Sequence, residues 1–221
     1  MSKVILFGIG GGAQTALRYL SKDSQHEIVA FTVDRKNRNV ETFKGLPVVD
    51  FENVQDYFSP ENYKMFILLN FDDMNGLRTK KFEEAKRKGF TFINYISSNN
   101  KFVEEIQIGE NCFVLDNQTI NLDVKIGDNV VLWSGNHIGD RSIIDNNVWI
   151  SSQVAIGGDV KIGSKCFLGM HATISHSIEI AEKNFIGAGT LITKSTKKGN
   201  VFVQKSSDAL NLDSETFVKI L

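Results

Sequence analysis

Residues 108–197 repeat with a period of six. Through fifteen consecutive hexads, from Ile108 to Ile192, every opening residue is isoleucine, leucine or valine, and glycine often follows it. A period of six fits neither a helix nor a strand, but it suits a chain that turns a corner every six residues. Three such sides close a triangular coil of eighteen residues, so the fifteen hexads predict five coils of a parallel β-helix.

The repeat also predicts which side chains fill the coils. The aliphatic residue that opens each hexad points inward and stacks on its equivalent in the next coil, about 4.8 Å along the axis. The fifth residue of each hexad is small or slim and completes the interior. The two cysteines, Cys112 and Cys166, are both fifth residues and lie three coils apart, about 14 Å at the strand spacing. We therefore expect two unpaired thiols in the core.

The sixth residues of the hexads form an outward column on each side of the prism. On one side, which we call the aromatic column, they are Phe113, Val131, Trp149, Phe167 and Phe185. The second side is mostly charged, and the third carries mixed, smaller residues. Because an apolar row of this length marks an interface, we expect the aromatic column to face sister chains around a three-fold axis, in a homotrimer.

The first 96 residues show a different pattern, in which short apolar runs alternate with helical segments. A run at 3–7 leads into a glycine-rich turn and then into a helical segment. We expect further strands at 27–33, 64–70 and 89–95, and a helix at 75–88. This alternation predicts a small, open, Rossmann-like α/β domain.

The glycine turn suggests a ligand for that domain. Gly8, Gly10 and Ala13 match the pattern G-x-G-x-x-A, which brings backbone N–H groups and a helix N-terminus to a phosphate. With Gly11 they would hold a nucleotide, and Asp34, at the end of the second predicted strand, would meet a ribose or a base edge. The turn can instead serve only to let the helix pack on the sheet. Three or four strands favour a mononucleotide or a nucleotide sugar over a dinucleotide.

The two patterns predict two domains, a Rossmann-like unit at 1–96 and a β-helix with a C-terminal tail at 97–221. A polar link at 97–101 would join them. The tail contains a strand-like run at 201–203 and a helix near its end. We expect the tail to close the open end of the coils, where strand edges would otherwise be exposed.

Charge and hydropathy narrow the partners and the compartment. The formal net charge of −1 gives no electrostatic reason to bind nucleic acid or an anionic membrane. The chain has no apolar signal region at its start and no run of eighteen apolar residues, so we expect a cytoplasmic protein without membrane insertion. The four histidines make no ligand spacing with the cysteines, so we expect no metal.

A small nucleotide-binding unit followed by hexapeptide coils resembles the nucleotide-sugar acyltransferases of the bacillosamine, perosamine and sialic-acid O-acetyltransferase group. The similarity spans nearly the whole chain and is clearest at the glycine turn, in the hexads, and at 132–139 and 166–169. It implies a left-handed β-helix, an exception to the right-handed crossover rule. It also implies acetyl-CoA in a coil groove between two subunits, and a nucleotide-linked amino or deoxy sugar on the glycine turn.

For the coenzyme groove we single out the corners of the later coils. Glycines there leave the backbone open to a pantetheine arm, although they can also serve only to turn the chain. Lys194 and Lys197, near the end of the prism, are candidates to neutralise coenzyme phosphates, or are simply solvated. We expect acetyl-CoA to contact Gly157, Gly158, Gly169, Met170, Gly187, Ala188 and Gly189.

The catalytic base is the point at which this chain departs from the family. Relatives of this type usually have a histidine where this chain has Asp140, and a second acid or histidine where it has Arg141. A base must take the proton from the attacking amine or hydroxyl group. In this chain we expect that base to be either Asp140 or a histidine, and we expect Arg141, next to Asp140, to contact the substrate. His137 is the first candidate among the histidines, because it lies within the matching motif, and His176 is the second.

Two functions of different classes follow. The first is transfer of an acetyl group from acetyl-CoA to an amino or hydroxyl group of a nucleotide-linked sugar for surface polysaccharide synthesis. The second is a relative that binds the nucleotide sugar or acyl-CoA without efficient transfer, which the replacement at Asp140 favours. The short α/β unit and the coils both argue against a third possibility, a small oxidoreductase that uses the glycine turn.

Overall fold

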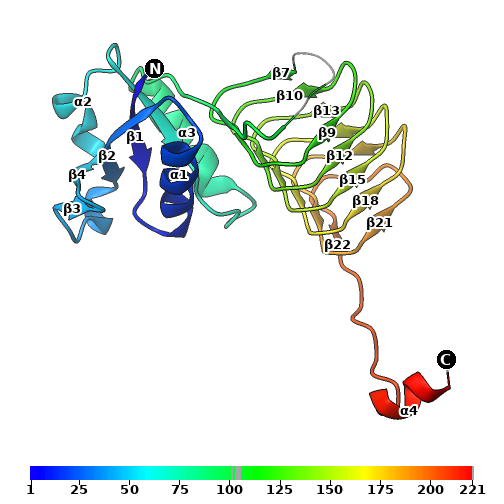
Figure 1. Ribbon diagram of the computed structural model, residues 1–221. Helices are drawn as coiled ribbons and strands as arrows, with labels where there is room; N and C mark the ends of the chain where they lie inside the picture. Colours follow the sequence, from blue (N-terminus) through cyan, green and yellow to red (C-terminus); the bar gives the residue numbers. More distant parts are fainter. Residues whose placement is uncertain (101, 103–105, 221) are drawn as a thin grey trace.

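The computed structural model describes residues 1–100, 102 and 106–220. Figure 1 shows an N-terminal α/β domain beside a triangular stack of coils, and a C-terminal arm that projects away from the end of the stack. Helices in this described part are all too short or too polar to cross a lipid bilayer.

Residues 1–100 contain the five-stranded sheet of the N-terminal domain, in the order β3-β4-β2-β1-β5. Four of its strands are parallel, and β3 pairs antiparallel with β4. Helices α1 and α3 pack on opposite faces of the sheet, in two separate clusters of buried side chains. The strands are β1 (Lys3–Phe7), β2 (Glu27–Val33), β3 (Thr42–Phe43), β4 (Leu46–Asp50) and β5 (Tyr63–Ile67). The helices are α1 (Gly11–Lys22), η1 (Arg35–Asn37), η2 (Phe51–Asn53), α2 (Val54–Tyr57) and α3 (Gly76–Arg87).

One strand prediction needs correction, and one pair of strands was not predicted. The segment 89–95 is not a strand, because it makes one isolated bridge, between Phe92 and Met65, before the chain crosses to the coils. There Tyr95 begins the pairing of the coil sheet instead. The hairpin of β3 and β4 was not predicted, although Lys44 and Gly45 between its strands both have positive φ, as such tight turns require.

The coils are built from fifteen two-residue strands among the described residues, each ending on the aliphatic residue that opens a hexad. Each pairs in parallel with strands eighteen residues away, as Val131 does with Trp149. The charged side contains β7 (Gln107–Ile108), β10 (Lys125–Ile126), β13 (Ile143–Ile144), β16 (Lys161–Ile162) and β19 (Glu179–Ile180). The mixed side contains β9 (Thr119–Ile120), β12 (His137–Ile138), β15 (Ala155–Ile156), β18 (Thr173–Ile174) and β21 (Leu191–Ile192).

The third side carries the aromatic column and has two further strands at its ends. β6 (Tyr95–Ile96) precedes the first of its coil strands and β22 (Val201–Phe202) follows the last. The strand-like run predicted at 201–203 is therefore confirmed, and the strand that ends the predicted first domain pairs with the coils. The coil strands of this side are β8 (Phe113–Val114), β11 (Val131–Leu132), β14 (Trp149–Ile150), β17 (Phe167–Leu168) and β20 (Phe185–Ile186).

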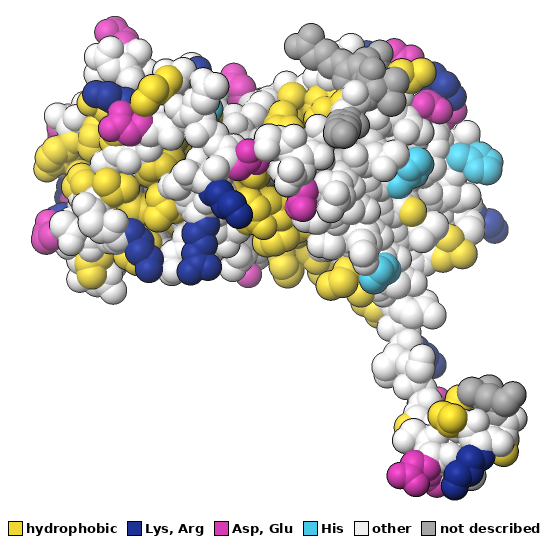
Figure 2. Space-filling view, in the orientation of Figure 1, with side chains coloured by type: hydrophobic (Ala, Val, Ile, Leu, Met, Phe, Trp, Pro, Cys, Tyr) yellow, Lys and Arg dark blue, Asp and Glu magenta, His cyan; other side chains and the backbone are white. Residues whose placement is uncertain are grey.

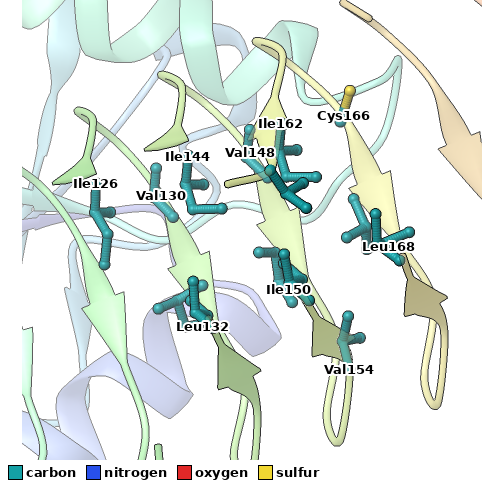
Figure 3. Packing of buried hydrophobic residues seen from close by; sticks show 14 of the residues in the cluster. Ile126, Val130, Leu132, Ile144, Val148, Ile150, Val154, Ile162, Cys166 and Leu168 are labelled. Carbon is teal, nitrogen blue, oxygen red and sulfur yellow. The ribbon is translucent and has the colours of Figure 1, made fainter. Parts of the chain in front are cut away.

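Stacked aliphatic side chains form the core of the coils, as the hexads predict. Figure 3 shows three such stacks inside the prism, two of residues that open hexads and one of fifth residues. Cys112 and Cys166 are fully buried and unpaired, and burial raises the pKa of each thiol to about 12. The labelled stacks are Ile126, Ile144 and Ile162; Val130, Val148 and Cys166; and Leu132, Ile150 and Leu168.

The prediction that the aromatic column faces sister chains was wrong, because the column is covered by this chain's own N-terminal domain. Phe113, Val131, Trp149 and Phe167 are at most 8% exposed and share one cluster with core residues of the α/β domain. Phe71 packs on the column, with ring centroids 5.6 Å from Trp149 and 4.3 Å from Phe167. The apolar row is an interface, but it joins two domains of one chain. It no longer supports a trimer, which stays a prediction.

Arg78 of α3 anchors the domain interface at a corner of the coils. Its guanidinium is fully buried and donates to the backbone oxygens of Asn129 and Asn147, the latter at 3.2 Å. It also donates to Oδ1 of Asn75 at 2.9 Å and lies 5.8 Å from the centre of the Trp149 ring. Burial lowers the pKa of Arg78 to about 9, still above neutrality. The cation is therefore stabilised by carbonyl dipoles, with no carboxylate bound to it among the described residues.

The link and the tail depart in part from their predictions. Of the link at 97–101, Asn100 lies against the coils and its Nδ2 donates to the Leu115 oxygen at 2.9 Å, while position 101 is outside the described residues. The predicted terminal helix is confirmed as α4 (Ser214–Lys219). The first part of the tail covers the end of the coils, because β22 pairs with β20 and Phe202 packs against the coil core. Residues 203–220 do not close the coils, because they are exposed and lead away from them (Figure 1).

The domain interface generates a stability prediction. Arg78→Ala removes the donors to two buried carbonyl oxygens, and each unsatisfied acceptor costs about 1–3 kcal/mol. We expect the free energy of unfolding in urea, followed by tryptophan fluorescence, to fall by about 3 kcal/mol. Arg87→Ala, on the exposed side of the same helix, is the control and should change it by less than about 0.5 kcal/mol. Equal stability of the two variants would contradict the role given to Arg78.

Candidate functional site

The glycine turn joins β1 to α1 at the carboxyl ends of the parallel strands. Gly8 has a left-handed backbone, with φ of +100°, and its N–H donates to the Thr32 oxygen at 2.8 Å. Gly10 caps α1 without a side-chain hydrogen bond. Gly10 and Gly11 are exposed, and a Cβ added to either would meet no atom within 4 Å. The first N–H groups of α1 therefore face open space that an anion can occupy.

The rest of the turn serves packing. Ala13 is 3% exposed and belongs to the core of the α/β domain. A Cβ on Gly12 would overlap the backbone oxygen of Leu68, so only glycine lets α1 approach β5 this closely. Both interpretations of the motif thus hold for different residues, with Gly10 and Gly11 open to a ligand and Gly12 and Ala13 needed by the fold.

Asp34 follows β2 at the same edge of the sheet, but its carboxylate already has a partner. Nζ of Lys81 lies 2.5 Å from Oδ1 of Asp34 and 2.7 Å from Oε2 of Glu84. Burial alone would lower the pKa of Lys81, but these two hydrogen bonds reverse the effect and the pKa is raised. The cluster lines a crevice of about 460 Å³ between α3 and η2, which sequence reasoning did not predict.

The coils present three corners, and the N-terminal domain covers only one side of the triangle. Helix α3 lies along the charged–aromatic corner, where Asn111, Asn129 and Asn147 are stacked in the left-handed conformation. Helix α1 lies beside the aromatic–mixed corner, at Trp133. The mixed–charged corner is therefore opposite the N-terminal domain. The aromatic–mixed corner contains 133–136, 151–154, 169–172 and 187–190, and the mixed–charged corner contains 121–124, 139–142, 157–160 and 175–178.

Asp140 lies on the mixed–charged corner and connects two coils. Its Oδ1 accepts from the N–H of Leu122 in the preceding coil at 3.1 Å. Asp128 makes the same contact with Glu110 at 2.9 Å on the charged–aromatic corner. The interaction is therefore a recurring feature of coil stacking. It occupies one carboxylate oxygen of Asp140 and leaves the other for a proton.

Arg141 neighbours Asp140 but binds elsewhere. Its Nε and Nη2 donate to the two carboxylate oxygens of Asp159, both at 2.7 Å. These hydrogen bonds raise the pKa of Arg141 and lower that of Asp159. Because this corner is opposite the N-terminal domain, one chain does not bring Arg141 to Gly8, Gly10 and the other residues predicted for the nucleotide.

The two candidate histidines differ in position. His137 is exposed on the mixed side, in β12, between the two corners. His176 is exposed on the mixed–charged corner, two coils beyond Asp140, with Gly158 between them. Its backbone sits so close to Gly157 that a Cβ there would come within 2.9 Å of His176 Cα. Figure 2 shows histidines grouped on the coil half of the molecule, away from the N-terminal domain.

The residues predicted for acetyl-CoA fall on two corners and make no single groove in one chain. Gly157 and Gly158 are on the mixed–charged corner, while the other five are on the aromatic–mixed corner, with the mixed side between them. Gly169 is required by stacking, because a Cβ there would lie 2.6 Å from the nitrogen of Ala188. Gly187 is also buried beneath Phe202. By contrast, Met170, Ala188 and Gly189 are exposed and available to a ligand.

A cleft of about 430 Å³ between α1 and the coils was also missed by sequence reasoning. It is lined by Thr15, Arg18, Tyr19 and Lys22 on α1, and by Trp133 on the coils. The helical spacing of these four residues was a usable signal, because they share one face of α1. The sequence does not predict that this face of α1 lies against Trp133, because that contact depends on how the two domains pack. The cleft begins one helical turn from the open glycines and offers two cations and two aromatic rings.

Metal ligation has no visible site in this arrangement. Over residues 1–100, 102 and 106–220, no three or more histidine, cysteine or carboxylate side chains converge in a way that would hold an ion.

Family models match part of the coils. The model described as bacterial transferase hexapeptide, of six repeats, matches residues 141–176. The hexapeptide repeat of succinyl-transferase matches residues 159–194. No curated protein sequence matches this chain.

Solved structures match almost the whole chain at low sequence identity. A histidine-to-asparagine mutant of perosamine N-acetyltransferase from Caulobacter crescentus, in complex with CoA and GDP-perosamine, has a TM-score of 0.77 and 22% identity, over 91% of this chain and 93% of that one. The acetyltransferase domain of PglB from Neisseria gonorrhoeae FA1090 has a TM-score of 0.77 and 19% identity, over 91% and 96%. WeeI from Acinetobacter baumannii AYE has a TM-score of 0.75 and 18% identity, over 91% and 96%.

These matches confirm the fold class predicted from the sequence, a Rossmann-like domain followed by a left-handed parallel β-helix. At these identities, the likeness to the solved structures concerns the fold. The chain carries the hexapeptide repeat of bacterial transferases and has the two-domain fold of the nucleotide-sugar acetyltransferases that its sequence resembles.

Proposed function

We propose that this protein transfers an acetyl group from acetyl-CoA to an amino or hydroxyl group of a nucleotide-linked sugar. The observation that carries the proposal is the shared two-domain fold, which extends over 91% of the chain to a structure that holds CoA and GDP-perosamine. The open glycine turn supports the same function, because it leaves helix N–H groups free for phosphates. Use of the product in surface polysaccharide, and a cytoplasmic site of action, belong to the same proposal.

In this proposal the nucleotide phosphates bind at Gly10 and Gly11, on the N-terminus of α1. The ligand then continues along α1 into the cleft, where Arg18 and Lys22 neutralise its charge and Trp133 offers a ring to stack on. Asp34 can still accept from a hydroxyl group through Oδ2, because Lys81 occupies Oδ1. Apart from Trp133, which is on the coils, each of these groups lies on the carboxyl edge of the sheet or on α1.

The candidate base and the glycine turn of one chain lie on opposite sides of its coil stack, which supports a site shared between copies. Asp140 and Arg141 lie on the corner opposite the side that the N-terminal domain covers. Packing chains side by side around a three-fold axis would bring the mixed–charged corner of one copy toward the aromatic–mixed corner of its neighbour. The two groups of residues predicted for acetyl-CoA would then line one groove. We therefore retain the homotrimer as part of the proposal.

The chemistry requires one base and one oxyanion donor. The sugar's amine or hydroxyl attacks the thioester carbonyl and loses its proton to the free oxygen of Asp140 or to His137. A backbone N–H of the coil stabilises the negative oxygen of the tetrahedral intermediate. The C–S bond then breaks, and CoA leaves as a thiol after it recovers the proton.

The alternative function is binding of the nucleotide sugar or acyl-CoA without efficient transfer. The contact between Asp140 and the Leu122 N–H favours it, because that contact commits one carboxylate oxygen of Asp140 to the stacking of the coils. Both functions predict binding of the nucleotide sugar or acyl-CoA, but only the first predicts turnover.

The first test measures thiol release from acetyl-CoA with a panel of nucleotide amino and deoxy sugars. We expect turnover by the native chain. One of the two variants Asp140→Asn and His137→Asn, the one that removes the base, should lower kcat by about 100- to 10,000-fold, the usual size of a general-base effect. His26→Asn, in the N-terminal domain, is the matched control and should stay within about two-fold. Turnover that both variants keep would remove the assignment of the base, and a chain that binds the sugars without releasing thiol would be the binding relative.

The second test concerns the glycine turn. In Gly11→Glu the new carboxylate enters open space, so the fold is kept, but it repels phosphates at the N-terminus of α1. We expect the Kd for a nucleoside diphosphate, measured by calorimetry, to rise at least about ten-fold, equivalent to 1.4 kcal/mol. Gly11→Ala should change it much less. An unchanged Kd in Gly11→Glu would place the nucleotide elsewhere.

The third test asks whether the site is shared between copies. Gly11→Glu chains bind the nucleotide sugar weakly, and chains that carry the inactivating base variant lack the base. Co-expressed, purified as mixed oligomers and assayed at a sugar concentration below the weakened Kd, they should show more thiol release than either variant alone. Complete inactivity of mixtures that are shown to contain both chains would mean that each site is built from one chain.

A further inference from the structure

The C-terminal arm, residues 204–220, exposes an apolar surface. Its apolar side chains are 38–69% exposed. Within the described part of the chain, no hydrogen bond joins the arm to the coils or to the N-terminal domain. Figures 1 and 2 show it hanging away from the end of the coils, with apolar and charged side chains on its short helix. The exposed apolar residues are Leu210, Leu212, Phe217, Val218 and Ile220.

We expect the exposed apolar side chains of the arm to be buried against another surface. A six-residue helix such as α4 is too short to be stable alone in water. Burying a side chain of the size of leucine or phenylalanine contributes about 1.5–3 kcal/mol. Asp213 caps the helix, with Oδ1 accepting from the Thr216 N–H at 2.9 Å, which favours the helical conformation once the arm is covered.

The end of the coils offers a complementary cleft of about 350 Å³. Its apolar part is formed by Ile192, Phe202 and Leu191, the last of which is 62% exposed. Its rim carries Lys194 and Lys197, and no acidic residue is among its lining residues. Neither lysine forms an ion pair with another described residue.

Charge matches the arm to this cleft. The arm carries Asp208, Asp213 and Glu215 next to its apolar side chains, and its basic residues are Lys205, at the start, and Lys219. Leucine and phenylalanine side chains fit the apolar part of the cleft, and the carboxylates fit its lysine rim. The two lysines would then neutralise carboxylates in place of coenzyme phosphates.

Chain length and direction favour the arm of another copy. The chain leaves its own coils pointing away from them, and residues 204–213 contain neither glycine nor proline to reverse it. From Val203 to Leu212 the extended chain spans about 30 Å, whereas one six-residue side of a coil spans at most about 20 Å. An arm of this length crosses to a neighbouring coil stack that lies parallel to its own.

We propose that the cleft at the end of the coils receives the C-terminal arm of a second copy of this chain. Leu212 and Phe217 of one copy pack on Leu191 and Phe202 of the other, and the arm's carboxylates face the lysine rim. The exchange fastens neighbouring copies at the end of the coil stack. It stands independently of the acetyl-transfer proposal, because it rests on the arm and the cleft alone.

Disulfide cross-linking tests the exchange. The native thiols, Cys112 and Cys166, are fully buried and their pKa is raised to about 12, so introduced cysteines are the reactive ones. Chains with Leu191→Cys and one affinity tag are co-expressed with chains that carry Phe217→Cys and a second tag, and then mildly oxidised. We expect a cross-linked pair that contains both tags and disappears on reduction. Lys125→Cys, exposed on the charged side, replaces Leu191→Cys in the control and should give no such pair.

The doubly substituted chain, Leu191→Cys with Phe217→Cys, separates the remaining outcomes. Disulfides formed only within single chains would mean that each arm folds back on its own coils, and would overturn the proposal. Absence of any disulfide would overturn it too. Reversing the arm's charge, with Asp213→Lys and Glu215→Lys, should lower the yield of cross-linked pairs at least about five-fold. Adding Lys194→Glu and Lys197→Glu to the partner should restore it.

Discussion

The eighteen-residue stacking of aliphatic side chains is the constraint on which the rest of the structure depends. Because each opening residue rests on its equivalent in the next coil, the two-residue strands gain a ladder and a dry interior at once. That stacking fixes the phase of every other position. It aligns the aromatic column, places Asn111, Asn129 and Asn147 at one corner, and sets Asp140 and His176 on another. A side chain's place on the coils is therefore known once its position in the hexad is known.

Docking of the N-terminal domain uses up one of the three sides and orients the others. Phe71 and Arg78 fix that domain on the aromatic column, and Arg78 does so through carbonyl oxygens of the coil corner. The glycine turn and the candidate base consequently lie on opposite sides of the coil stack. The chain shares its fold with acetyltransferases, yet one copy alone keeps the glycine turn and the candidate base apart. Association of copies would bring the two groups together. Both the homotrimer and the exchange of C-terminal arms are proposals about that association.

Local patterns predicted those parts that depend on neighbours in sequence or on a regular repeat. The coils, the strand Glu27–Val33 and the buried thiols of Cys112 and Cys166 are confirmed for this reason. The strand at 89–95 failed because the chain is diverted to the coil sheet after one bridge with Met65. Of the candidate site, the open glycines were found from the motif. The lysine partner of Asp34 and the cleft at Trp133 were missed, since each joins residues from distant segments.

The sequence by itself determined that this chain is a stack of triangular coils preceded by a small Rossmann-like α/β domain. A six-residue period has one physical solution when each hexad brings an aliphatic residue to the inside, and that solution requires no knowledge of distant contacts. Only the tertiary structure decided what the apolar outer row touches. An exposed aromatic column requires a cover, but its own pattern does not distinguish another chain from another domain. Here the cover is the N-terminal domain, because the segment before α3 presents Phe71 to the column and α3 presents Arg78 to its corner.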